Sequence, residues 1–318
     1  MTGKERFIKA LKREPITGHV PHFELVFYPT MEVLRKVHPE QRNLSQWKQM
    51  SATERELQVQ DAAETFIGIA DKYGHDAIFV HPSRYDPDYV KRILEVIREK
   101  SGSQYFLMMH GDPTFSIPNG ENMLSFTEQM YDDPDGLKDE AKRLTERHLE
   151  TARRTASWGA GLLDGYAMCS DYCLNANPFF TEEQFAEFVA PYLKQAIDGY
   201  RELGFYTIKH TDGNMMPILD QMLDCKPDAL HSLDPQGGVD LKYLKEYCGD
   251  RVCLIGNVNC GLLQTGTDEE IREDVLRALR DGMPGYGYIF STSNCIYTGL
   301  ALTRYEMMHG LWREFGEY

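Results

Sequence analysis

Eight short runs rich in β-branched and aromatic residues alternate with longer amphipathic segments along this chain of 318 residues. Such an alternation is typical of parallel sheets, in which each pair of neighbouring strands is joined by a helix. The predicted strands are 20–27, 76–81, 104–110, 161–168, 206–210, 229–233, 252–258 and 288–291. No glycine-rich dinucleotide fingerprint follows the first run. We therefore predict an α/β fold, a single (β/α)8 TIM-type barrel domain over residues 1–318 with extra N-terminal helices, and keep an open α/β sheet as the alternative.

Helix signals lie between these runs. Two sequence patterns predict capping boxes, at which helices begin. They are Thr181 with Gln184 and Thr267 with Glu270. The first of these helices is predicted to run to about Leu203 and to stop at Gly204. Further helices are predicted at 54–73, 87–100, 133–157, 214–224, 239–248 and 299–315.

Composition narrows the function classes. The formal net charge is −15 and no block of Lys or Arg stands out, which disfavours binding to nucleic acid or to an anionic membrane. The apolar stretches are too short to span a bilayer, and the first residues lack the apolar segment of a signal peptide. We therefore expect a cytoplasmic protein whose seven cysteines are free thiols or metal ligands.

Four of the predicted strands end on a residue that can bind a metal ion. These residues are His210, Asp234, Cys260 and Cys295. In a parallel barrel the carboxyl ends of the strands meet at one mouth, where the active sites of this fold lie. An imidazole, a carboxylate and two thiolates that converge there would form a zinc site, so the pattern predicts an enzyme. His210 and Asp234 could instead orient a substrate or a ligand, and Asp212 is a rival ligand.

Other polar residues follow predicted strands as well. Asp171, Tyr172 and Asp212 are predicted to line the pocket, where they would fix the substrate or relay a proton. Cys169 and Cys173 flank Asp171 and are interpreted as packing residues, because nothing nearby completes a ligand set. His81 and His110 each end a strand, and a lone histidine there is more often structural than catalytic.

Several segments together resemble the uroporphyrinogen decarboxylase superfamily. They are Asp76–Phe79, Phe180–Phe185, Pro191–Leu193, His210–Gly213, Gly256–Val258 and Gly285–Tyr288. The resemblance covers most of the chain and implies a (β/α)8 barrel. The decarboxylase branch opens with an arginine-rich segment that grips a polycarboxylate, whereas residues 20–27 contain no arginine, and His81 stands where that branch has its catalytic aspartate. Porphyrinogen decarboxylation is therefore disfavoured.

The other branch of this superfamily comprises methyltransferases of corrinoid-dependent systems, which carry zinc at the barrel mouth. His210 and Cys295 match the His-x-Cys with a distant Cys of its thiol-methylating members, but Asp212 replaces the middle cysteine. Asp234, Cys260 and Cys295 resemble the acidic residue and two cysteines of its O-demethylase members.

This resemblance implies a zinc-dependent methyltransferase. It would move a methyl group from a small O-methyl compound, such as an aromatic methyl ether, to the reduced cobalt of a corrinoid. The chain lacks the Asp-x-His-x-x-Gly motif by which corrinoid carriers ligate cobalt, so the corrinoid would arrive on a partner protein.

Three alternatives remain open on the sequence. One is a related thiol or amine methyltransferase, and another is a metal-free lyase in which His210, Asp212 and Asp171 act as acid–base groups. The third is a barrel that binds a small molecule without turnover, which the acid–base and thiol-rich mouth makes the weakest of the three.

Overall fold

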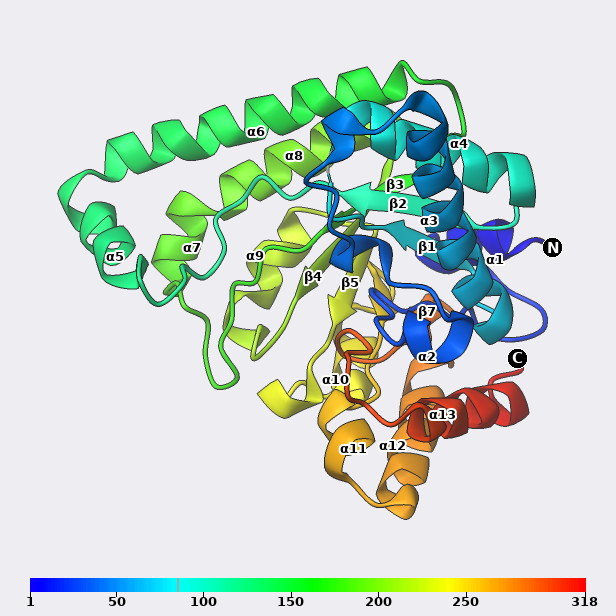
Figure 1. The fold of residues 1–318 in the computed structure, drawn as a ribbon. Coiled ribbons are helices and arrows are strands. Elements are labelled where there is room, and N and C mark those ends of the chain that lie inside the picture. The colour runs from blue at the N-terminus through cyan, green and yellow to red at the C-terminus, as the bar shows by residue number, and fades with distance from the viewer. Residues whose placement is uncertain (85) are drawn as a thin grey trace.

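The sheet consists of parallel strands arranged in the order of the sequence. The computed structural model describes residues 1–84 and 86–318. Within them one sheet contains β1 (Ala77–Val80), β2 (Phe106–His110), β3 (Gly165–Met168), β4 (Tyr206–Thr211), β5 (Ala229–Ser232), β6 (Cys253–Ile255) and β7 (Tyr288–Ile289). Every neighbouring pair is parallel, and the sheet curls as in a TIM barrel (Figure 1). The predicted parallel α/β architecture is confirmed, but seven regular strands instead of eight form a curled, TIM-like half-barrel in the described chain.

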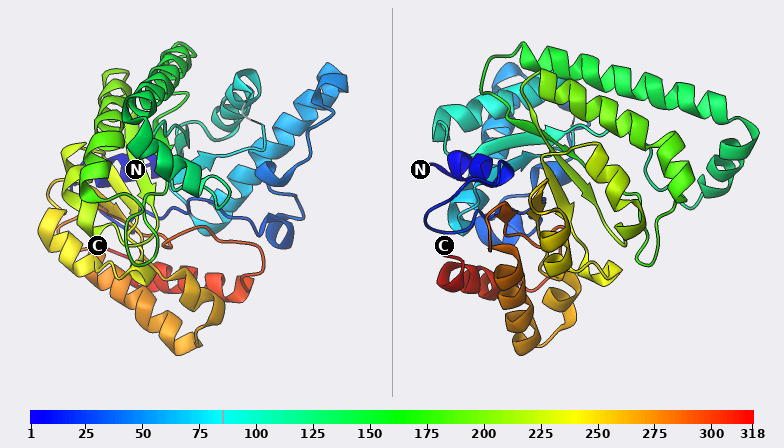
Figure 2. Two further views of the ribbon diagram at one scale, coloured as in Figure 1. Left: turned by 90° about the vertical axis from the view of Figure 1, so that its left-hand side faces the viewer. Right: turned by 180° about the vertical axis from the view of Figure 1, so that it is seen from behind.

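Helices surround this curled sheet, as the two further views show (Figure 2). They are α1 (Gly3–Leu11), α2 (Thr30–Leu34), α3 (Ala52–Tyr73), α4 (Pro87–Ser101), α5 (Met123–Asp132), α6 (Pro134–Ala156), α7 (Glu182–Phe188), α8 (Ala190–Glu202), α9 (Leu219–Asp224), α10 (Leu241–Cys248), α11 (Cys260–Thr265), α12 (Asp268–Gly282) and α13 (Leu302–Phe315). Both predicted capping boxes form, at Thr181 and at Thr267. In the part of the chain that the structure describes, no helix is both long enough and apolar enough to cross a bilayer.

The first predicted strand, 20–27, is not a regular strand. It makes only isolated parallel bridges, between His22 and Phe290 and between Phe27 and Ile296. Pro21 has no N–H to donate to a neighbouring strand. Between the two bridges the N–H of Thr292 donates to the Glu24 carboxylate at 3.2 Å, so a side chain takes the place of a backbone acceptor. The segment therefore lies beside the β7 end of the sheet without a continuous ladder.

The helix predicted from Thr181 to Leu203 is two helices, α7 and α8. They separate at Val189, which has φ −123° and ψ −57°, and Pro191 lies in the first turn of α8. Proline fits the first turn of a helix but disrupts a helix interior, because it lacks the N–H and clashes with the preceding turn. Gly204, with φ +84°, ends the helical pair as expected.

The two ends of the barrel are built differently. Helix α1 closes the amino-terminal end of the sheet: the Phe7 ring lies 4.8 Å from the ring of Phe106 and 5.9 Å from that of Phe23. These rings belong to an apolar cluster that fills the interior with the inward-facing residues of the strands, including Met108 and Ile208. The carboxyl-terminal end carries polar residues instead.

Candidate metal centre at the barrel mouth

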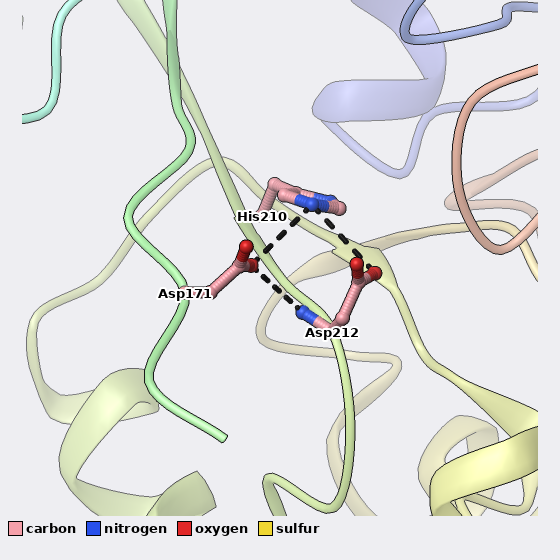
Figure 3. Close-up of side chains that lie close together, drawn as sticks. All are labelled: Asp171, His210 and Asp212. Atoms are coloured by element: carbon pink, nitrogen blue, oxygen red, sulfur yellow. Dashed lines mark hydrogen bonds and ion pairs between the residues drawn. The ribbon is translucent and has the colours of Figure 1, made fainter. Parts of the chain in front are cut away.

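Two carboxylates and one imidazole meet at the carboxyl ends of β3 and β4. His210 is in β4, Asp212 follows that strand, and Asp171 lies in the loop after β3. The Nε2 atom of His210 is 3.6 Å from Oδ1 of Asp171 and 3.7 Å from Oδ1 of Asp212, and Figure 3 shows both carboxylates beside the ring. One potential ligand atom from each of the three lies within 4.8 Å of the others, an arrangement that no other group of His, Cys, Asp and Glu has in residues 1–84 and 86–318.

The triad is buried on its imidazole side and open on its carboxylate side. The His210 side chain is 6% exposed, whereas those of Asp171 and Asp212 are 41% and 30% exposed. A ligand that enters the mouth therefore reaches the carboxylate oxygens first. Burial raises the pKa of Asp212, His210 opposes that rise, and the Asp171 carboxylate adds to it. A cation between the two carboxylates would offset their mutual repulsion.

Neighbouring strands hold the Asp212 carboxylate in place. Its Oδ1 accepts a hydrogen bond from the Ser232 hydroxyl at 2.8 Å, and its Oδ2 accepts one from the Asn294 amide. The backbone N–H of Asp212 donates to Oδ1 of Asp171 at 3.1 Å. The site therefore depends on β5 and on the loop after β7 as well as on the strands that carry the triad.

A second histidine contacts the far side of the His210 ring. The Nδ1 atoms of His210 and His231 are 2.8 Å apart, and these two residues are paired across β4 and β5. Burial, together with the neighbouring His210, lowers the pKa of His231 well below its ordinary value, so this ring is neutral. One Nδ1 must then donate and the other accept. If His210 donates, its Nε2 keeps a lone pair that faces the carboxylates, which is the tautomer a metal ligand needs.

The polar contacts continue from His231 into the barrel. The Nε2 of His231 lies 3.4 Å from the Ser291 hydroxyl, which donates to Glu24 at 3.4 Å. Glu24 also accepts a hydrogen bond of 2.5 Å from the Thr292 hydroxyl and contacts Nε2 of His22 at 3.2 Å. All of these groups are buried. A buried carboxylate at one end and the triad at the other form one connected polar network.

A buried ion pair fixes the backbone beneath the triad. Nζ of Lys209 is 2.8 Å from Oδ2 of Asp112, and both side chains are fully buried. The same ammonium donates to the carbonyls of Ser170 at 2.7 Å and His210 at 2.8 Å. Ser170 precedes Asp171 in the chain, so this one ammonium tethers the backbone at two members of the triad.

Tyr172, predicted to line the pocket, is fully buried. Its ring lies under Lys209, with Nζ 3.9 Å from the ring centroid, and its hydroxyl pairs with that of Thr114 at 2.6 Å. Burial raises the pKa of the hydroxyl well above its usual value. A role for Tyr172 in proton transfer stays a prediction.

The predicted ligand set of His210, Asp234, Cys260 and Cys295 is not gathered into one cluster in the described chain. Asp234 serves as the cap of a 3-10 turn (Pro235–Gly237), and its carboxylate accepts the N–H groups of Gln236 at 2.9 Å and of Gly213 at 3.2 Å. Each of its oxygens therefore already accepts one hydrogen bond from the backbone. Metal ligation by Asp234 stays a prediction, as does ligation by the two cysteines.

The two cysteines come from the segments that follow β6 and β7. Sγ of Cys260 is 3.9 Å from the carbonyl oxygen of Cys295. Burial raises the pKa of Cys260 to about 11, and burial with the charge of Cys260 and Asp212 raises the pKa of Cys295. Without a metal both are thiols at neutral pH, and a thiol must lose its proton to ligate a metal ion.

Sequence reasoning found the three triad residues but missed the groups that support them, among them His231, Ser232 and Asn294. For His231 a signal existed. It lies two residues before the end of its run, and alternation in a strand turns it to the same face as Ala229 in the barrel interior. A histidine on that face needs a polar partner.

The sequence model of the uroporphyrinogen decarboxylase (URO-D) family matches residues 114–315, more than half of the sequence. The chain therefore belongs to this family. Among solved structures, a methyltransferase from Methanosarcina mazei superposes with a TM-score of 0.74 at 19% identity and covers 99% of both chains. A sugar phosphate isomerase/epimerase from Parabacteroides distasonis reaches a TM-score of 0.45 at 13% identity, with 83% of this chain and 91% of that chain covered. No curated protein matches the sequence significantly.

Proposed function

We propose that this protein is a zinc-dependent methyltransferase that moves a methyl group from a small O-methyl compound to the corrinoid of a partner protein. The observation that carries the proposal is the cluster of Asp171, His210 and Asp212 at the mouth of a URO-D-family barrel. The similarity in fold to a methyltransferase over 99% of both chains supports the reaction class.

The donor set fits a divalent cation. One imidazole nitrogen and two carboxylate oxygens are ligands that zinc accepts, and catalytic zinc sites use three protein ligands with an open fourth position. His210 presents Nε2 to the carboxylates while its Nδ1 contacts His231, as ligating histidines usually do with a neighbouring group. His210, Asp171 and Asp212 would hold the ion, and when bound it would act as a Lewis acid toward the ether oxygen.

The residues of the chain would hold the ligating groups in position for the reaction. His231 would keep His210 in the required tautomer, and Ser232 with Asn294 would fix Asp212. In the proposed reaction the bond between the methyl carbon and the ether oxygen would break, and the corrinoid of the partner protein, when present, would be the nucleophile that accepts the methyl group. The oxygen leaves with a negative charge and takes up a proton from solvent. The exposed side of Asp171 and Asp212 would face both reactants.

Metal analysis of the purified protein beside its Asp212→Ala variant tests the proposal first. We expect about one zinc per chain in the wild type and a loss in the variant. A panel of methoxylated phenols is then incubated with cob(I)alamin, and methylated cobalamin and free phenol are both quantified. A protein with no stoichiometric metal and no methyl transfer would contradict the proposal.

A second candidate is a metal-free lyase in which the triad performs acid–base chemistry. The raised pKa of Asp212 favours it, because a general acid must hold a proton, and a carboxyl group with a raised pKa keeps its proton to higher pH than an ordinary one does. Under this candidate, full activity toward a carboxylated substrate would persist after exhaustive chelation, whereas methyl transfer would not occur.

A further inference from the structure

A cavity beside the mouth is lined by cationic and apolar groups. It has a volume of about 450 Å³ and lies between helices α4 and α6, over the ends of β1 and β2. Arg147, Thr151 and Arg154 contribute one face of α6, and Trp158 follows that helix. Small-molecule sites commonly have volumes of 300 to 1,000 Å³, so a ligand of the size of a substituted benzene ring fits.

The charge of this cavity is opposite to that of the protein. Two arginines and the histidines 81, 110 and 148 line it, and none of the described lining residues is acidic. The chain as a whole has 49 acidic and 34 basic residues. The two guanidinium groups carry this positive charge, since burial lowers the pKa of His110. Two such groups in one concave site of an acidic protein favour an anionic ligand.

Arg147 is the group most available to that ligand. It is exposed, and its guanidinium has no ion-pair partner among the residues that the structure describes. Arg154 has only a loose contact of 3.7 Å with Asp88, and both side chains are exposed, a geometry that contributes little energy. His81 is already paired with Glu40 at 2.8 Å. The guanidinium of Arg147 therefore has N–H donors available for two parallel hydrogen bonds to a carboxylate.

The rest of the cavity lining is largely apolar. Pro87 and Val90 of α4, Met109 of β2 and Trp158 contribute to it. An inorganic anion would gain nothing from such a wall, whereas an aromatic ring would bury its surface there. The cavity also reaches the last turn of α6, where the negative end of the helix dipole disfavours a doubly charged group. A monoanion with a flat apolar body fits better than a phosphate.

We propose that this cavity is a binding site for a small aromatic carboxylate, with the carboxylate on Arg147 and the ring against Trp158 and Met109. His110 lies at the same sheet edge as the triad, two strands from His210, which corresponds to on the order of 10 Å. A bound ligand would therefore sit next to the metal centre. The proposal concerns binding alone and does not depend on methyl transfer.

Fluorine NMR with the metal-free full-length protein tests this site. The probe is para-fluorobenzoate, and para-fluorobenzyl alcohol is the uncharged counterpart. We expect saturable broadening of the carboxylate signal, displacement by benzoate, at least about tenfold weaker binding of the alcohol and no displacement by inorganic phosphate.

Two variants on one helix locate the site. Arg147→Ala is expected to weaken binding by about tenfold, since it removes a charged hydrogen-bond donor. Arg143→Ala, one turn earlier on α6 and outside the cavity lining, is the matched control and should bind as the wild type does. Equal affinity of the Arg147 variant and the wild type, absence of saturable binding, or displacement by phosphate at similar concentration would each overturn the proposal. Because no metal or corrinoid takes part, a failure here differs from a failure of the methyl-transfer assay.

Discussion

The two sides of the barrel mouth start from the same position in the fold but carry different chemistry. On the carboxylate side, Asp171, His210 and Asp212 follow or end β3 and β4, and their potential ligand atoms converge. On the thiol side, Cys260 and Cys295 follow β6 and β7, and burial raises the pKa of both thiols. The carboxylate side is supported by a buried ion pair and a second histidine, whereas the described contacts of the Cys260 sulfur are with the loop that carries Cys295. The comparison teaches that a position at a strand end is not enough for a binding site. The side chain must also be held in place by buried partners.

The largest expected effect concerns the ion pair beneath the carboxylate side. Lys209→Met leaves Asp112 buried without its partner, which should lower the free energy of unfolding by about 3 to 5 kcal/mol. Urea denaturation followed by circular dichroism measures this loss. Lys194→Met, which removes an exposed i,i+4 pair with Asp198, is the control and should cost less than about 1 kcal/mol. A loss as small as the control's would show that the ion pair does not support this side of the mouth.

The next effect concerns the triad itself. Asp212→Ala should reduce zinc affinity by about 100-fold or more, since a ligand matters more than the outer partners whose loss costs 10- to 100-fold. Competition with a chromophoric chelator gives the affinity. Asp234→Asn, at the end of β5, is the comparison, because its oxygens already accept backbone N–H groups. A larger loss of zinc affinity for the Asp234 variant would indicate that the metal ion binds to the ligand set predicted from the sequence, which includes Asp234.

A smaller effect is expected at the residue behind the triad. His231→Phe removes the partner of the His210 Nδ1 but leaves His210 in place. Zinc affinity should fall by about 10- to 100-fold, because the ring loses the contact that sets its tautomer. The same chelator competition measures it, with Ser291→Ala, one contact further from the triad, as a milder control. Unchanged affinity would mean that the second histidine only fills space.

The smallest effect should come from the thiol side. Cys260→Ser and Cys295→Ser are each expected to change zinc affinity by less than about tenfold, since neither sulfur belongs to the convergent cluster. If either variant loses about 100-fold, a thiolate ligates the metal, and the contrast between the two sides disappears. Metal content of the two single variants, measured beside the wild type, decides this directly.

The sequence predicts the strand ends well because each depends on local patterns. The run that ends on His210 and the run that precedes Asp171 were recognisable from the sequence, and parallel pairing brings their ends to one mouth. The partners that complete the site depend on register between remote segments. Asn294 donates to Asp212 although the two residues are 82 positions apart in the sequence. His231 contacts His210 only because the register of β4 and β5 places the two residues opposite each other. The irregular course of residues 20–27 was also not predicted from the sequence, since the Glu24 side chain replaces a backbone acceptor there.

The hydrogen bonds of Glu24 to Thr292 join positions that are 268 residues apart. On a ribosome that adds about 5 to 20 residues per second, the first of these emerges more than roughly ten seconds before the second. Until residue 292 has emerged, the Glu24 carboxylate lacks its Thr292 partner, and the polar network behind His231 is incomplete. Maturation of the mouth must therefore follow completion of nearly the whole polypeptide, so a nascent chain released before residue 292 would contain the three triad residues yet lack their innermost support.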